Sequence, residues 1–68
     1  MAEQRVSVST AEIQRYLGGI DYPANREDLI NHARKNSAPE EVISVLSRIE
    51  EREFHSAADV NQAIGKIE

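Results

Sequence analysis

Apolar residues recur every three or four positions in four segments of the chain, the spacing that places them on one face of an α-helix. The pattern predicts four short amphipathic helices over about residues 10–17, 26–35, 38–50 and 57–66. The third segment has the widest apolar stripe, so we expect it to contact more than one neighbouring helix. That stripe consists of Val42, Ile43, Val45, Leu46 and Ile49.

Each of these segments is preceded by the same type of start signal. A polar side chain that can cap a helix N-terminus stands three positions before an acid, as in a capping box. We therefore expect helix starts at all four sites, with a proline in the first turn of the third helix. The four tetrapeptides are Ser9-Thr10-Ala11-Glu12, Asn25-Arg26-Glu27-Asp28, Ser37-Ala38-Pro39-Glu40 and Ser56-Ala57-Ala58-Asp59.

Stop signals separate the helices. Gly18 and Gly19 follow the first helix, where a positive φ is easily adopted by glycine. Pro23 disfavours helical backbone at Tyr22, which predicts a turn before the second helix. At the end of the second helix we expect Asn36 to take the left-handed cap position.

Two short segments have extended character. Residues 5–8 alternate and contain valine, and residues 52–55 precede the last helix. A minimal two-strand ribbon between them is an option, and we expect Phe54 to enter the core. The predicted fold is an all-α, compact bundle of four short helices, with that ribbon near the N-terminus as the possible addition. Residues 1–8 form an arm that is either disordered or a short strand, and residues 9–68 form a single helical domain.

Composition narrows the choice of function. The chain has 68 residues, a formal net charge of −4 and no cysteine, which excludes disulfides and thiolate metal sites. No apolar run is long enough for a signal peptide or a membrane span, so we expect a cytoplasmic protein without membrane contact. The acidic balance argues against general nucleic-acid binding. A domain of this size has a marginal core, which a second copy could complete, so a homo-oligomer is one hypothesis.

Catalytic and metal-binding patterns are absent from the sequence. His32 and Asp28 share a helix face, but the chain has no His-x-x-x-His or His-x-His spacing. Most serines stand at the predicted caps, and neither a Gly-x-Ser-x-Gly elbow nor a glycine-rich phosphate loop is present. We therefore expect a protein that is not an enzyme and uses no metal or cofactor.

The first candidate surface is the connection between the first two helices, because loops carry function more often than cores do. Tyr22 has two interpretations: it is an exposed contact residue, or it folds inward and covers the core. The function predicted from this surface is that of a small non-enzymatic protein-interaction or regulatory module with an unknown protein partner. The surface comprises Gly18, Gly19, Asp21, Tyr22 and Pro23.

The alternative function is that of a nucleic-acid-binding accessory protein with a local basic patch. It requires the first two helices to gather four bases, against the net negative charge of the whole chain. The competing interpretation is a scattered, solvated set of charges. The four bases are Arg15, Arg26, Arg34 and Lys35.

Longer motifs carry a family resemblance. Residues 16–30 read Tyr-Leu-Gly-Gly-Ile-Asp-Tyr-Pro-Ala-Asn-Arg-Glu-Asp-Leu-Ile, and residues 38–42 and 52–60 add Ala-Pro-Glu-Glu-Val and Arg-Glu-Phe-His-Ser-Ala-Ala-Asp-Val. The chain resembles a small bacterial family, domain of unknown function 2795, over about residues 10–67. Ile49 and the two glutamates after it depart from the Leu-Pro that many relatives carry. The resemblance implies a compact helical domain in a bacterial cytoplasm, and it implies no activity, cofactor or site residue.

Overall fold

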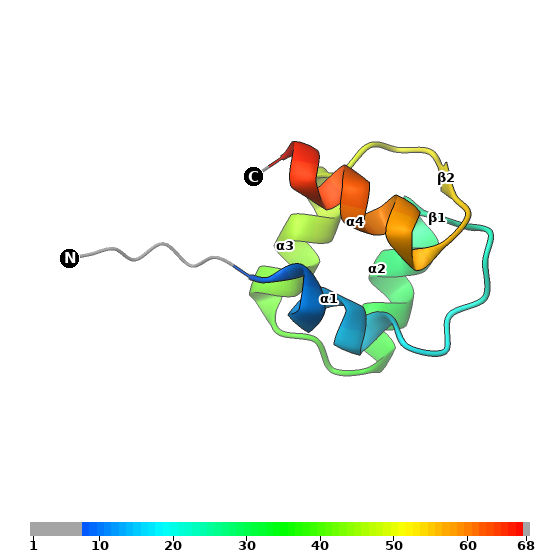
Figure 1. Ribbon diagram of the computed structural model, residues 1–68. Coiled ribbons are helices and arrows are strands. Elements are labelled where there is room, and N and C mark those ends of the chain that lie inside the picture. The colour runs from blue at the N-terminus through cyan, green and yellow to red at the C-terminus, as the bar shows by residue number, and fades with distance from the viewer. Residues whose placement is uncertain (1–7, 68) are drawn as a thin grey trace.

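All four predicted helices are present in the computed structural model, which describes residues 8–67 (Figure 1). Two very short strands lie between them, each just before a helix. In chain order the elements are α1 (Thr10–Leu17), β1 (Ala24–Asn25), α2 (Arg26–Lys35), α3 (Glu40–Arg48), β2 (Glu53–Phe54) and α4 (Ala57–Lys66).

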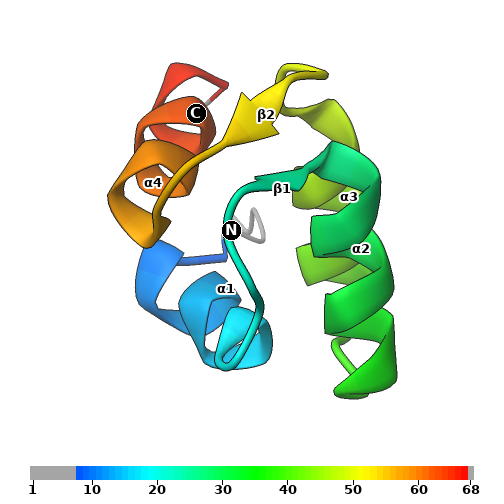
Figure 2. The ribbon, with the colours of Figure 1, turned by 90° about the vertical axis from the view of Figure 1, so that its right-hand side faces the viewer.

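The helices form two layers. Figure 2 shows α1 and α4 on one side of the molecule and α2 and α3 on the other, with β1 and β2 side by side at one end. The strands pair antiparallel, with Ala24 opposite Phe54 and Asn25 opposite Glu53. The fold is therefore the predicted bundle of four short helices with a minimal ribbon.

The ribbon uses a different first strand from the one expected. Residues 53–54 form a strand as predicted, but their partner is Ala24–Asn25 instead of residues 5–8. Residues 5–7 lie outside the described part of the chain, and Val8 belongs to no strand but packs on the core. Pairing Ala24 with Phe54 buries both side chains, at 2% and 0% exposure, which is the physical advantage of the observed partner.

A single apolar core fills the space between the layers. Phe54 is fully buried in it, as expected from the sequence. Among the described residues no polar or charged residue is buried, so each of them reaches the surface. The core consists of Ile13, Leu17, Ala24, Leu29, Ala33, Val42, Ile43, Val45, Leu46, Ile49, Phe54, Val60, Ala63 and Ile64.

Three of the four predicted start signals act as caps. The Ser9 hydroxyl accepts from the Glu12 N–H at 3.2 Å, and the Ser56 hydroxyl accepts from the Asp59 N–H at 3.2 Å. Asn25 forms the full capping box, because its side chain accepts from the Asp28 N–H (2.9 Å) while the Asp28 carboxylate accepts from the Asn25 N–H (3.2 Å). Each cap satisfies amide groups that have no partner within the helix.

The turn between α2 and α3 corrects two predictions. Ser37 does not cap α3; instead it has a φ of 63° and ends α2, which is the role expected of Asn36. The Ala38 N–H donates to the Ala33 carbonyl and the Ser37 N–H donates to the Arg34 carbonyl, both at 3.0 Å. This is the Schellman pattern, which needs its left-handed residue one position beyond the cap.

Helix α3 is shorter than the predicted 38–50. Pro39 is its N-cap with a ψ of 164°, and Ile49 is its C-cap with a ψ of 167°, so both residues are extended. Ile49 is nevertheless 1% exposed, as its place in the apolar stripe predicts. The stripe thus marks buried positions correctly beyond the end of the helix.

Helix α2 holds the C-terminal ends of both neighbouring helices. Its His32 Nε2 donates to the Gly18 carbonyl at 2.8 Å, and Asn36, its C-cap, donates to the Tyr16 carbonyl at 2.9 Å. At its other end the Arg26 guanidinium donates to the carbonyls of Ser47 and Ile49, both at 3.3 Å. These side chains satisfy carbonyls that helix ends leave without partners.

Candidate functional site

An open groove of about 650 Å³ lies between the connection that follows α1 and the outer face of α2. The connection forms one wall and the helix forms the other. The groove is lined by Gly19, Ile20, Asp21 and Pro23 from the connection and by Asp28, Asn31, His32 and Lys35 from α2.

Helical periodicity explains the wall that α2 provides. Asp28, Asn31, His32 and Lys35 stand at i, i+3, i+4 and i+7, so they share one face. The opposite face buries Leu29 and Ala33 in the core. The groove-forming face of α2 is therefore held in position by the packing behind it.

The other wall is shaped at both ends. Gly19 has a φ of 85°, which turns the chain away from α1 in a conformation that other residues adopt only with strain. The hydrogen bond from His32 to Gly18 holds the start of the connection against the C-terminal half of α2. At its other end the connection enters β1 and then α2 directly, so it runs alongside the helix in the opposite direction.

The structure brings together three of the five residues predicted for the first candidate surface. Gly19, Asp21 and Pro23 line the groove and are exposed, while Gly18 contributes its carbonyl to the bond with His32. Tyr22 is partly buried and packs against the core instead of lining the groove. Burial raises the pKa of the Tyr22 hydroxyl above its usual value.

The four bases of the nucleic-acid hypothesis are distributed along two helices. Arg26 begins α2, and Arg34 and Lys35 end it, so Arg26 is about 12 Å from Arg34 along the helix axis. Arg26 is also engaged with the C-terminal end of α3 and pairs with Glu51 at 3.6 Å. Arg15 is exposed in the last turn of α1.

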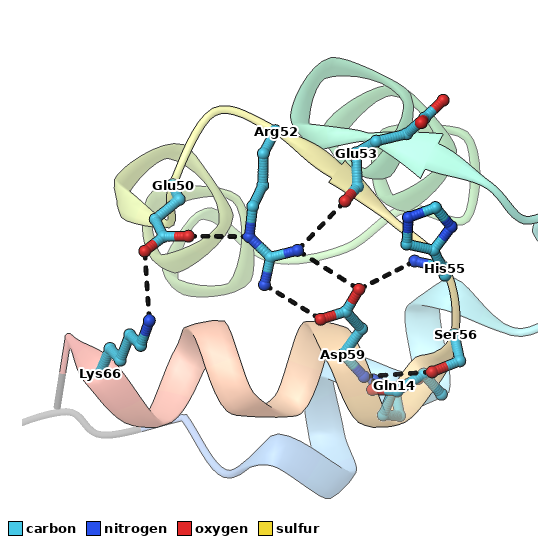
Figure 3. Close-up of polar contacts among 9 residues, drawn as sticks. Gln14, Glu50, Arg52, Glu53, His55, Ser56, Asp59 and Lys66 are labelled. Atoms are coloured by element: carbon cyan, nitrogen blue, oxygen red, sulfur yellow. Dashed lines mark hydrogen bonds and ion pairs between the residues drawn. The ribbon is translucent and has the colours of Figure 1, made fainter.

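A second cluster of polar side chains, around Arg52, joins β2 to α4 (Figure 3). The Arg52 guanidinium donates to both oxygens of Asp59, at 3.0 and 3.3 Å, and to Glu50 at 2.7 Å. It also lies 4.4 Å from the centre of the Phe54 ring. Glu50 accepts in addition from Lys66 at 3.3 Å. We call these five residues the Arg52 cluster.

The Arg52 cluster has a structural role. Its hydrogen bonds hold the pKa of Asp59 below the usual range, first through Arg52 and then through the backbone N–H of His55. The pKa of Glu50 is lowered in the same way by Arg52 and then by Lys66. These bonds fix the segment between β2 and α4 over the buried Phe54.

Neither a metal site nor a membrane span emerges from the described residues. Within residues 8–67 no three or more His, Asp or Glu side chains are grouped so that they could hold an ion. In the same range no helix is long and apolar enough to cross a membrane.

Comparison with models of protein families tests the family resemblance that the sequence motifs suggested. A family model described as "Protein of unknown function (DUF2795)" matches residues 8–61. The chain belongs to the DUF2795 family. The match includes both walls of the groove and most of the Arg52 cluster. Comparison of this DUF2795 domain with curated proteins and with solved structures finds no match.

Sequence reasoning missed the half of the groove that α2 contributes to the DUF2795 domain. It placed Asp28 and His32 on one face but did not connect that face with the preceding loop. The available signal was the run of polar residues at helical spacing opposite Leu29 and Ala33. The sequence does not reveal the hydrogen bond between His32 and Gly18, because this is a tertiary interaction.

Proposed function

We propose that this DUF2795 domain is a small non-enzymatic protein-interaction module of the bacterial cytoplasm, and that its partner binds in the groove between the α1–α2 connection and α2. The observation that carries the proposal is the groove itself, an open concave surface at the loop that the sequence singled out. Exposed loops on a rigid scaffold are common binding sites.

Polar side chains elsewhere on the surface support this choice, because they already form hydrogen bonds and ion pairs that stabilise the fold. Arg26 holds the end of α3, and the Arg52 cluster fixes the segment before α4. By contrast, within residues 8–67 no side-chain hydrogen bond or ion pair engages Asp21, Asn31 or Lys35. Polar side chains in a concave, exposed position provide orientation and specificity in binding sites.

Two other hollows on the surface are less suitable as binding sites for a partner. The one between Val8 and α3 measures about 410 Å³ and lies over Glu40, Glu41 and Arg48. The one beside the ribbon measures about 320 Å³ and is lined by Arg26 and Arg52, whose guanidinium groups already form ion pairs. The groove at the α1–α2 connection has the largest volume of the three, and its lining includes Asp21, Asn31 and Lys35, which none of the described side-chain hydrogen bonds or ion pairs engages.

Site-specific photocrosslinking in the host cell tests the proposal. A photoreactive amino acid at position 21 should capture one protein partner, whereas the same group at position 62, exposed on α4, should not. Equal capture from both positions, or none from position 21, would contradict the proposal. The far-ultraviolet circular dichroism of both labelled proteins checks that the fold is retained.

The same experiment distinguishes the nucleic-acid alternative. Crosslinked samples are divided and treated with or without nuclease before the partners are identified. A partner that remains bound after nuclease treatment supports the interaction module. Capture that disappears with nuclease and weakens steeply with salt would favour the basic residues instead.

A further inference from the structure

The groove has opposite charges at its two ends. Asp28 lies in the first turn of α2 and Lys35 is the last residue of that helix, so their backbones are about 10 Å apart along the axis. The connection runs antiparallel to α2, and its Asp21 adds a second carboxylate to the lining. Two acids and one base therefore line a single groove.

These charges are accessible to a partner. Asp21, Asp28 and Lys35 are all exposed, and within residues 8–67 no ion pair involves any of them. Asp28 uses Oδ2 for the capping box, and none of the described hydrogen bonds involves its Oδ1. Ile20 and Pro23 supply apolar surface in the same lining.

The distance between the charged ends of the groove sets the spacing of the charges in an occupant. In the extended polyproline II conformation a chain rises about 3.1 Å per residue and completes a turn every three residues, so side chains three positions apart share one face and lie about 9 Å apart. A segment of this kind can place both of its charged side chains in the groove.

We propose that the groove binds an extended segment of a partner protein that carries a basic and an acidic side chain about three residues apart. The basic side chain pairs with Asp28, and the acidic one pairs with Lys35. The residues between them contact Ile20 and Pro23. This inference rests on the proposed function, and it specifies the chemistry of the partner that the groove accepts.

Selection from a display library of short random peptides tests the charge pattern. The full chain should enrich peptides with a base and an acid three positions apart. Lys35→Glu makes both ends acidic, so it should enrich peptides with two bases at that spacing. Arg48→Glu is the matched control, because Arg48 is also an exposed base at the last position of a helix, and it should select the same peptides as the unchanged chain.

Affinities of one synthetic peptide from the first selection complete the test. We expect binding to Lys35→Glu to be about tenfold weaker, because attraction is replaced by repulsion, and binding to Arg48→Glu to be unchanged. Circular dichroism verifies that both variants retain their helices. Amide chemical shifts should move at residues 19–22 and along the outer face of α2.

The outcomes separate the inference from the proposed function. Peptides that shift the groove amides but lack the charge pair would overturn the inference and leave the interaction module standing. Enrichment of no peptide, or of peptides that shift amides elsewhere only, would overturn both. A concentration-dependent dimer in ultracentrifugation, with the groove amides shifted, would identify a second copy as the occupant and overturn the partner segment.

Discussion

Ser37 and Ser44 have opposite backbone handedness: Ser37 has a φ of 63°, whereas Ser44 lies in right-handed backbone inside α3. The left-handed conformation costs a non-glycine residue roughly 1–2 kcal/mol. We expect Ser37→Gly to raise the free energy of unfolding by about 0.5–1 kcal/mol, after allowance for the larger freedom of glycine in the unfolded chain. Urea denaturation measures this change.

The same substitution at Ser44 is the control for that prediction. Glycine inside an exposed helix is unfavourable, so Ser44→Gly should lower the free energy of unfolding by about 0.5 kcal/mol. Opposite signs at the two serines would confirm that Ser37 is the left-handed end of α2. Destabilisation of similar size at both positions would contradict it.

The capping box at the start of α2 predicts a second stability change. Asn25→Ala removes the acceptor for the Asp28 N–H, so it should cost about 1 kcal/mol of unfolding free energy. Asn31→Ala, in the middle of the exposed face of the same helix, should cost nothing or be slightly stabilising, because alanine has the higher helix propensity. Equal losses in urea denaturation would show that the cap contributes nothing.

Phe54 is the largest fully buried side chain, and its truncation should remove a large part of the stability of the fold. Replacing it with alanine leaves a cavity that costs about 3–5 kcal/mol, against a total stability of about 3–10 kcal/mol for a chain of this length. Phe54→Leu keeps most of the volume and should remain folded, with a loss of about 1–1.5 kcal/mol. Circular dichroism with thermal and urea unfolding distinguishes the two. A Phe54→Ala variant that loses no more stability than Phe54→Leu would contradict the central position of this ring.

The Arg52 cluster predicts a loss of stability in acid. The folded-state pKa values of Asp59 and Glu50 are lowered, chiefly by hydrogen bonds from Arg52. Carboxylates with lowered folded-state pKa values stabilise the fold above their unfolded pKa of about 4, and the contribution disappears as the pH falls through the folded-state values. We therefore expect the unfolding free energy to decline as the pH is lowered from about 5 to 2.

Substitution at Asp59 should make that decline shallower. Asp59→Asn removes one of the two shifted carboxylates, so stability at neutral pH falls while its dependence on acid weakens. Glu41→Gln, at an exposed position in the first turn of α3, is the control and should leave the slope closer to that of the unchanged chain. An identical slope in the Asp59 variant would show that the cluster does not couple folding to protons.

Local rules were enough to locate the four helices, but not to fix every helix boundary or the contacts between helices. The start signals at Ser9, Asn25 and Ser56 act over three or four residues, so the sequence reveals them directly. At the end of α2 the same rules pointed to Asn36 for the left-handed position. The side chain of Asn36 instead donates to Tyr16, a partner on another helix that no local pattern indicates.

The candidate site was likewise predictable where it depends on local sequence and not predictable where it depends on tertiary contacts. Glycine and proline in the α1–α2 connection marked an exposed turn, and Gly19, Asp21 and Pro23 do line the groove. The second wall of the groove, α2, faces the connection only because the connection folds back along that helix. The hydrogen bond between His32 and Gly18 holds it there, and these two residues are far apart in the sequence. The charge of Arg26 makes it a candidate for the alternative basic patch, whereas its geometry makes it a cap for α3.

The position of α2 between the ends of α1 and α3 makes the folding of this domain cooperative. Helices of eight and nine residues are unstable in isolation. Because both depend on α2 for their last carbonyl partners, opening α2 releases them together. Amide hydrogen exchange should therefore proceed in all three helices through one common unfolding event, and a fragment that lacks α2 should remain a random coil.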